Sequence, residues 1–304
     1  MLITPPNTGI LIPIPQYPLY TATLAQHHGV PLPYHLDEAS GWSTSLHEIE
    51  AALEHPQHAK ITPKALVIIN PGNPTGALLD EVTQEKLVHL CEKHNLVLLA
   101  DEVYQTNLHR PDEHPFVSFK QIVSRMKSKG GYFDHVNSPD DILARIYKMV
   151  SVGLCPPLSG QIGVDCQVRP PKPGDESYPL WKKETDTIHA ALASRTRTMS
   201  ERLNSLPGIS CVNSPGALYL YPKVHLSDRA IEAARKVGKE PDAFYAMKLL
   251  DETGICVVPG SGFGQKEGHW HYRLTCLCPG VDDYVDALAN FHKRFIAEYG
   301  AAEE

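Results

Sequence analysis

Two short polar motifs in this 304-residue chain contain residue types that can bind a charged aromatic ring. The run 70–76 holds Asn73, and the run 101–104 holds Asp101 and Tyr104, each directly after an apolar stretch. A carboxylate at a buried strand end is costly unless a cation or a donor meets it, and a protonated pyridine nitrogen would do so. An amide and a phenol suit a ring oxygen, so the set matches the needs of pyridoxal phosphate. On spacing alone, a loop cap and an ordinary turn remain the alternative interpretation.

The apolar stretches and the segment between them predict how these motifs are positioned. Residues 65–69 have the apolar, β-branched character of a buried strand, and 96–101 is a second strand, an apolar run that ends at Asp101. Residues 78–94 read as an amphipathic helix. A strand–helix–strand unit of this kind predicts two parallel strands. Asn73 and Asp101 should then lie together at the carboxyl edge of a sheet, where open α/β folds bind ligands.

Six stretches, in order along nearly the whole chain, resemble the class I and II aminotransferases, which are fold type I pyridoxal phosphate enzymes. The alanine aminotransferase branch is the closest match. The stretches are 12–20, 70–76, 98–105, 154–157, 254–264 and 272–275. Together they are far more specific than any one motif alone.

The resemblance implies a role for each matching residue. Tyr17 would stack on the cofactor ring, Asn73 and Tyr104 would hold the ring oxygen, and Asp101 would face the pyridine nitrogen. Arg273 would bind the α-carboxylate of the substrate, a role that suits a planar guanidinium because it can form two parallel hydrogen bonds. Taken singly, Arg273 would be a surface arginine and Tyr17 a core aromatic residue.

The chain departs from the family pattern in two places. The family has a longer N-terminal stretch before the motif at 12–20, including a helix start that helps to bind the phosphate. After the Asp-x-x-Tyr motif the family has a further strand, then Ser-x-Ser-Lys-Gly with the Schiff-base lysine, then Arg-Gly-Gly-Tyr. Here 118–136 is too short for all of these. Lys129 is either the Schiff-base lysine or a basic residue in a shortened loop, and Lys127 is the fallback.

These features leave two main functional hypotheses open. The resemblance implies a pyridoxal phosphate-dependent transaminase that moves an amino group between alanine and 2-oxoglutarate, acting as a homodimer. The alternative is a catalytically impaired isoform or relic, truncated at its N-terminus and internally deleted, that acts at most as a dimerisation partner. A divergent paralogue, or another reaction such as β-elimination on the same cofactor, also stays open.

Composition excludes several other classes of protein. A net charge of −7 without a basic patch argues against a nucleic-acid partner. The apolar runs are too short to span a membrane, and no metal-ligand spacing appears among the cysteines and histidines. The seven cysteines are expected to be reduced. The sequence predicts a cytoplasmic protein, or a mitochondrial one if an N-terminal segment has been lost.

The predicted fold is α/β, with an incomplete large domain at 1–166 and an inter-domain helix and smaller α/β domain at 167–304. The large domain should contain a mostly parallel sheet of the fold type I kind. Its expected strands are 9–14, 31–35, 65–69, 96–101 and 131–136, and its expected helices are 46–54, 78–94 and 141–152. In the second domain we expect helices at 179–205, 227–237, 241–253 and 281–298, and strands at 209–212, 217–222, 255–258 and 271–276.

Overall fold

The computed structural model describes residues 3, 7–126, 140–153 and 157–302. Its contacts divide the chain into two units, and each is described here by itself. The first comprises Met1–Phe119 and His189–Glu304, and the second is Lys120–Ile188. The predicted domain boundary at 166/167 falls inside the second unit.

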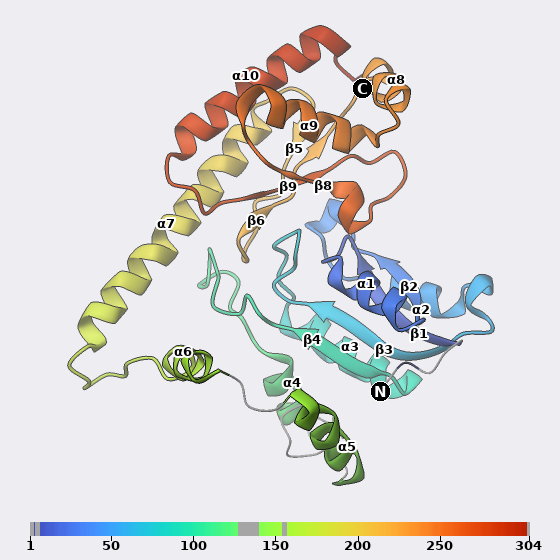
Figure 1. Ribbon diagram of the computed structural model, residues 1–304, viewed down its shortest axis with the longest axis vertical. Coiled ribbons are helices and arrows are strands. Elements are labelled where there is room, and N and C mark those ends of the chain that lie inside the picture. The colour runs from blue at the N-terminus through green and yellow to red at the C-terminus, as the bar shows by residue number, and fades with distance from the viewer. Residues whose placement is uncertain (1–2, 4–6, 127–139, 154–156, 303–304) are drawn as a thin grey trace. The chain divides into compact units, whose positions relative to one another are not determined.

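A four-stranded parallel sheet forms the N-terminal part of the first unit (Figure 1). Its strands follow the order β2-β1-β3-β4 and are β1 (Thr8–Ile14), β2 (Val30–His35), β3 (Thr62–Ile69) and β4 (Val97–Asp101). All three neighbouring pairs are parallel, which confirms the predicted α/β class and parallel sheet. Ile69 is paired with Asp101, so β3 and β4 end side by side.

The helices around this sheet are α1 (Leu19–Gln26), α2 (Leu46–Glu54) and α3 (Glu81–His94). Helix α2 has the predicted bounds. Helix α3 begins at Glu81 rather than at 78, because the Asp80 carboxylate accepts a hydrogen bond from the Thr83 amide at 2.7 Å and caps the helix. Helix α1 was not predicted, since its eight residues carry no amphipathic pattern.

The C-terminal part of the first unit is a smaller α/β arrangement (Figure 1). It contains strands β5 (Ile209–Ser210), β6 (Tyr219–Leu220), β7 (Lys223–Val224), β8 (Val258–Pro259) and β9 (Tyr272–Thr275), and helices α8 (Asp228–Lys236), α9 (Pro241–Thr253) and α10 (Val281–Tyr299). The strands pair antiparallel. They are shorter than predicted, because only a few residues of each predicted strand form hydrogen bonds with a neighbouring strand. Helix α9 ends in a left-handed cap at Gly254, which has a φ of 75° and whose N–H donates to the Leu250 carbonyl at 2.8 Å.

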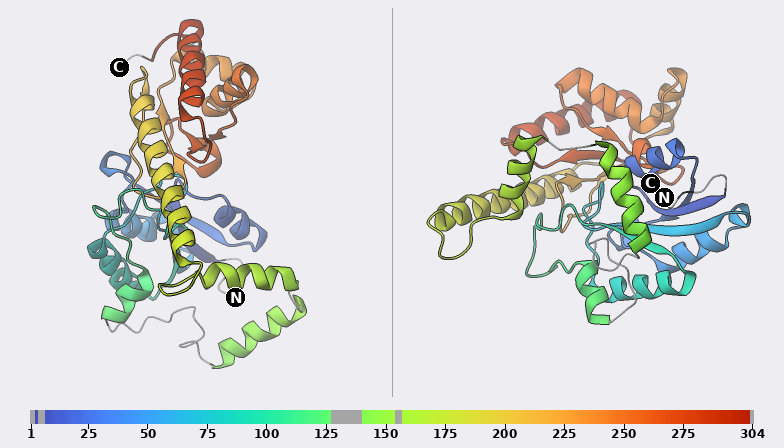
Figure 2. Two further views of the ribbon diagram at one scale, coloured as in Figure 1. Left: turned by 90° about the vertical axis from the view of Figure 1, so that its left-hand side faces the viewer. Right: turned by 60° about the horizontal axis from the view of Figure 1, so that its bottom comes forward.

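Helix α7 (Tyr178–Asn204) is a long helix (Figure 2). Its residues are divided between the two units. Leu192, Met199 and Leu203 on this helix are buried, whereas Ile188 is 65% exposed. The C-terminal half lies beside α10, where Arg202 forms ion pairs with Asp282 and Asp286.

The second unit contains α5 (Asp140–Val150) and α6 (Leu158–Val168), together with most of α4 (Phe119–Met126). The predicted helix 141–152 corresponds to α5 and the 3₁₀ turn η3 (Ser151–Gly153). The predicted strand 131–136 lies outside the described residues.

Among the helices that the structure describes, none has the length and apolar character of a membrane span.

One histidine makes stability sensitive to pH. His109 follows β4, its amide donates to the Pro215 carbonyl at 2.9 Å, and its Nε2 lies 3.5 Å from Thr196 Oγ1 on α7. Burial, with a smaller contribution from the charge of Arg110, lowers the pKa of His109 to about 4. The folded protein therefore binds this proton less readily than the unfolded chain does. The stabilisation is complete above the unfolded pKa of about 6.5 and is lost as the pH falls towards 4.

We therefore expect His109→Gln to flatten the pH dependence of stability. Between pH 7 and 4, the free energy of unfolding should fall by about 1–2 kcal/mol more in the wild type than in the variant, after a reduction for solvent screening. Urea denaturation at each pH measures this difference. His114→Gln changes an exposed histidine and should follow the wild type. Parallel curves for wild type and His109→Gln would contradict the assignment.

Candidate active site

The loop that carries Asn73 is fixed against a segment far away in the sequence. Gly76 has a φ of +68°, and a Cβ at this position would lie 2.6 Å from Ser214 Cβ and 2.7 Å from the Gly216 oxygen. Glycine is required because no other residue tolerates both this backbone conformation and this close approach. Ser214 Oγ donates to the Thr75 oxygen at 2.9 Å, and the Gly216 amide donates to the Gly76 oxygen at 3.1 Å. Asn73 is thereby held beside the C-terminal part of the unit.

Asn73 and Arg273 meet directly, although 200 residues separate them. Arg273 Nη1 donates to Asn73 Oδ1 at 3.0 Å, and Asn73 is only 6% exposed. The guanidinium carbon lies 4.3 Å from the centre of the Tyr219 ring and 4.9 Å from that of Phe263. Arg273 Nε is buried and has no hydrogen-bond partner. An arginine placed in this way retains the capacity to bind a carboxylate.

Tyr104 joins the same cluster through Tyr219. The two phenol oxygens are 2.9 Å apart, and the rings meet edge to face with centres 5.7 Å apart. Burial, then the hydrogen bond to Tyr219, raises the pKa of Tyr104; the charge of Asp101 also raises it, and that of Arg273 opposes the change. Tyr104 is therefore a neutral phenol at physiological pH and can donate a hydrogen bond.

Asp101 ends β4 and presents a carboxylate with two protein partners. Its Oδ2 accepts a hydrogen bond from the Tyr20 hydroxyl at 2.6 Å, and its Oδ1 accepts one from the Val103 amide at 3.3 Å. Burial, together with the hydrogen bond to Asp101, raises the pKa of Tyr20, which stays a neutral donor. Since a carboxylate has about four acceptor positions, Asp101 can accept another donor.

The structure brings together four of the residues predicted from the sequence, namely Asn73, Asp101, Tyr104 and Arg273. The fifth, Tyr17, is 41% exposed, and its carbonyl oxygen accepts a hydrogen bond from the Tyr20 amide at 3.3 Å. Lys129 and the fallback Lys127 lie outside the described residues. The functional role of each residue remains a prediction.

Sequence reasoning missed three residues of the cluster, which are Tyr20, Tyr219 and Phe263. Tyr20 could have been found, because it lies within the motif 12–20 and only three positions after Tyr17. No comparable signal existed for Tyr219. Its place beside Arg273 depends on the antiparallel pairing of β6 with β9, which sequence spacing does not reveal.

These side chains fit a pyridine ring that carries an oxygen substituent. Asp101 offers spare acceptor positions, Tyr104 offers a neutral hydroxyl, and Asn73 offers an amide. The buried, unpartnered Nε of Arg273 fits a substrate carboxylate nearby. None of the residues matched from the sequence is assigned to a phosphate, so the fit concerns the ring and the substrate.

Comparison with known families agrees with this geometry. The sequence profile of the family described as "Aminotransferase class I and II" matches residues 1–126 and 174–291. The chain belongs to this family. Residues 127–173 lie outside the match, and they include Lys127, Lys129 and the stretch 154–157.

Individual relatives are similar over nearly the whole chain. A protein named probable mitochondrial alanine aminotransferase, from Dictyostelium discoideum, is 43% identical over 324 positions, which cover 98% of this chain and 61% of that protein. A glutamate–glyoxylate aminotransferase from Arabidopsis thaliana is 40% identical over 318 positions, with 96% of this chain and 66% of that protein covered. The chain thus spans less than two thirds of their length. Both alignments are longer than the chain itself, so the relatives contain residues inside the aligned region that this chain lacks.

Solved structures support the fold. An alanine aminotransferase from Pyrococcus furiosus superposes with a TM-score of 0.74 over 96% of this chain and 72% of that protein. The sequence identity is 24%, so this similarity bears on the fold alone. It agrees with the predicted fold type I architecture.

The hydrogen bond between Tyr20 and Asp101 can be tested through stability. We expect Tyr20→Phe to lower the free energy of unfolding by about 1–2 kcal/mol, because it removes a half-buried hydrogen bond to a carboxylate. Urea denaturation of the protein without added cofactor measures the change. Tyr17→Phe removes a hydroxyl from an exposed ring and is the matched control. Equal free energies of unfolding of the two variants would show that the 2.6 Å hydrogen bond between Tyr20 and Asp101 does not stabilise the fold.

Proposed function

We propose that this chain binds pyridoxal phosphate and that its site is built for transamination. The observation that carries this proposal is the 3.0 Å hydrogen bond between Asn73 and Arg273. It brings an arginine suited to a substrate carboxylate next to the amide, phenol and carboxylate suited to the cofactor ring. Membership of the aminotransferase family supports the same chemistry.

Each residue would have a defined task. Asp101 would accept a hydrogen bond from the pyridine nitrogen and keep it protonated, while Asn73 and Tyr104 would hold the ring oxygen and Tyr17 would cover the ring. Once bound, the cofactor supplies an electron sink for the α-carbon of the substrate. Arg273 would bind the substrate carboxylate and so orient the α-carbon. Lys129 would supply the amine that holds the cofactor covalently and moves the α-proton.

Alanine as donor and 2-oxoglutarate as acceptor are our proposed substrates, supported by the names of the relatives. A relative named as a glutamate–glyoxylate aminotransferase makes glyoxylate the acceptor to test beside them. A homodimer is proposed from the family resemblance. We propose a cytoplasmic location; the names of several relatives support the mitochondrial alternative.

A second candidate is the catalytically impaired isoform. Two observations favour it. Residues 127–173 fall outside the family match, and the relatives contain residues within the aligned region that this chain lacks. Such a protein would keep the ring-binding residues but would lack an efficient lysine.

Cofactor binding tests the role of Asp101. We expect Asp101→Ala to weaken pyridoxal phosphate binding by about 10–100-fold, because a hydrogen bond to a charged group contributes about 1.5–3 kcal/mol. Titration followed by visible absorbance measures the dissociation constant. Asp112→Ala removes an exposed carboxylate outside the cluster and should leave the constant unchanged. Unchanged binding in Asp101→Ala would overturn the proposed ring site.

Borohydride reduction separates the two candidate functions. For a working transaminase, reduction with bound cofactor should label one lysine, which peptide mapping identifies as Lys129 or Lys127. The unreduced protein should then form pyruvate from alanine and 2-oxoglutarate. Lys129→Ala should abolish both signals, and Lys127→Ala should leave them if Lys129 is the lysine used. Cofactor binding without a labelled lysine and without pyruvate would favour the impaired isoform.

A further inference from the structure

A buried histidine near the candidate site has acceptors at both ring nitrogens. His271 Nε2 lies 3.1 Å from Glu38 Oε1, and its Nδ1 lies 3.3 Å from Gln265 Oε1. The orientation of the Gln265 amide is fixed, because its nitrogen donates to Asp242 Oδ2 at 3.1 Å and its oxygen accepts from the His271 amide at 3.2 Å. A carboxylate and an amide oxygen can only accept. A ring with hydrogen on both nitrogens, which is an imidazolium, would satisfy both acceptors.

The His271 ring is buried among aromatic rings. The residue is 2% exposed, and its ring stacks on Tyr221 with centres 4.8 Å apart and planes within 5°. The Trp42 ring lies 5.4 Å away. Aromatic faces attract cations, whereas burial disfavours a charged ring, so an imidazolium here depends on the carboxylate beside it.

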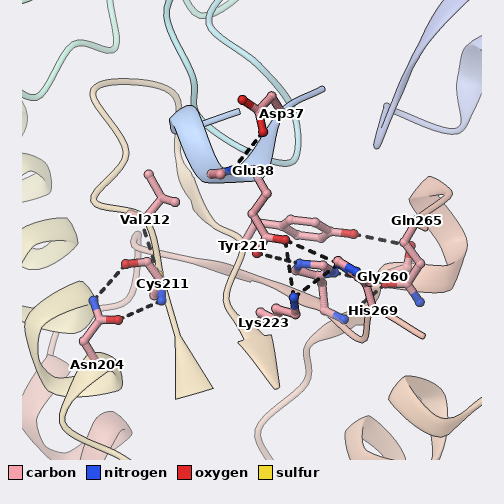
Figure 3. A network of polar contacts seen from close by, with 12 residues as sticks. Asp37, Glu38, Asn204, Cys211, Val212, Tyr221, Lys223, Gly260, Gln265 and His269 are labelled. Carbon is pink, nitrogen blue, oxygen red and sulfur yellow. Dashed lines mark hydrogen bonds and ion pairs between the residues drawn. The ribbon is translucent and has the colours of Figure 1, made fainter. Parts of the chain in front are cut away.

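Glu38 is the anion that pairs with this cation. In Figure 3 the Glu38 side chain points toward Lys223 and His269. Its Oε2 lies 3.7 Å from Lys223 Nζ and 3.6 Å from His269 Nδ1. Burial opposes the ionisation of Glu38, but the hydrogen bond from His271 and the nearby positive charges outweigh it, so the pKa of Glu38 is lowered. Burial and the charge of Lys223 lower the pKa of His269, which leaves Lys223 and His271 as the two cations around one carboxylate.

This ion pair acts on the strand that carries Arg273. His271 directly precedes β9 and stands two residues before Arg273, so both side chains leave the strand on the same side. The His271 carbonyl accepts a hydrogen bond from the Gly260 amide at 2.7 Å. Gly260 is the first residue of the 3₁₀ turn η4 (Gly260–Phe263). Phe263, at the end of that turn, covers the Arg273 guanidinium. Glu38 itself opens the turn η1 (Glu38–Ser40), which follows β2 in the parallel sheet.

We propose that Glu38 is a positioning residue for the proposed carboxylate site. Through the His271 imidazolium it holds β9 and η4 against the segment that follows β2, so that the Arg273 guanidinium is presented beside Asn73. The inference rests on the proposed function of Arg273. It adds an ion pair to the contacts that already join the same two parts of the first unit, among them the hydrogen bond between Arg273 and Asn73.

Nitrogen NMR on protein labelled at histidine tests the charge of His271. At about pH 8 the wild type should show one histidine with both ring nitrogens protonated and slow hydrogen exchange, although free histidine is neutral there. His271→Gln assigns the signal by its loss. Glu38→Gln keeps the shape but removes the anion, so the ring should become neutral at the same pH. A neutral His271 ring in the wild type would overturn the proposal.

Carboxylate binding tests the positioning role, with 2-oxoglutarate as the probe and calorimetry as the measurement. Glu38→Gln should raise the dissociation constant at least about tenfold. Glu50→Gln is the matched control, because it disrupts an exposed ion pair with Lys93, 2.8 Å long, on α2 and α3, and should leave the constant unchanged. Glu38→Asp keeps the charge and should restore part of the affinity. The measurements are made where all variants are folded, so that a loss of stability alone does not alter the constant.

The outcomes separate this inference from the proposed function. If wild type and Glu38→Gln bind 2-oxoglutarate equally well, Arg273 does not depend on Glu38, and only the positioning role is wrong. If the wild type does not bind 2-oxoglutarate at all, the proposed role of Arg273 is wrong, and the positioning role fails with it.

Discussion

The positive charge of Arg273 is the constraint on which the candidate site depends. Among the described residues, no carboxylate forms an ion pair with this guanidinium. Its contacts are a neutral amide oxygen at 3.0 Å and the faces of two aromatic rings, and one of its buried N–H groups has no partner. A partly buried cation in such surroundings is only partly compensated, which favours binding of an anion. The fold must therefore hold segments from both ends of the chain around one unpaired charge.

The tyrosines near the site contribute donors without adding charge. Burial and neighbouring groups raise the pKa values of Tyr20 and Tyr104, so each remains a neutral phenol. Tyr20 satisfies part of the Asp101 carboxylate and leaves acceptor positions for a further donor. Among the described residues, the cluster thus combines the carboxylate of Asp101 and the guanidinium of Arg273 with neutral hydrogen-bonding side chains.

The sequence predicted the parallel sheet and one edge of the site, for a clear physical reason. Asn73 and Asp101 follow neighbouring parallel strands, so local periodicity and turn residues suffice to place them together. The approach of Arg273 to Asn73 depends on the packing of 214–216 against the loop at Gly76, and no local pattern encodes that contact. Arg273 was matched through family resemblance, whereas Tyr219 and the Glu38 network required the structure.

Two cations on the same side of one strand illustrate the difference between a structural charge and a functional one. His271 and Arg273 are two residues apart, and each contacts a residue from the N-terminal part of the unit. His271 meets the carboxylate of Glu38, so its charge is compensated within the protein. Among the described residues, Arg273 meets the neutral oxygen of Asn73 and two aromatic rings but no carboxylate, so its charge is available. His271 directly precedes β9, so the ion pair that holds His271 also restrains the backbone of the strand that carries Arg273. Arg273 is thereby held where an external anion could bind.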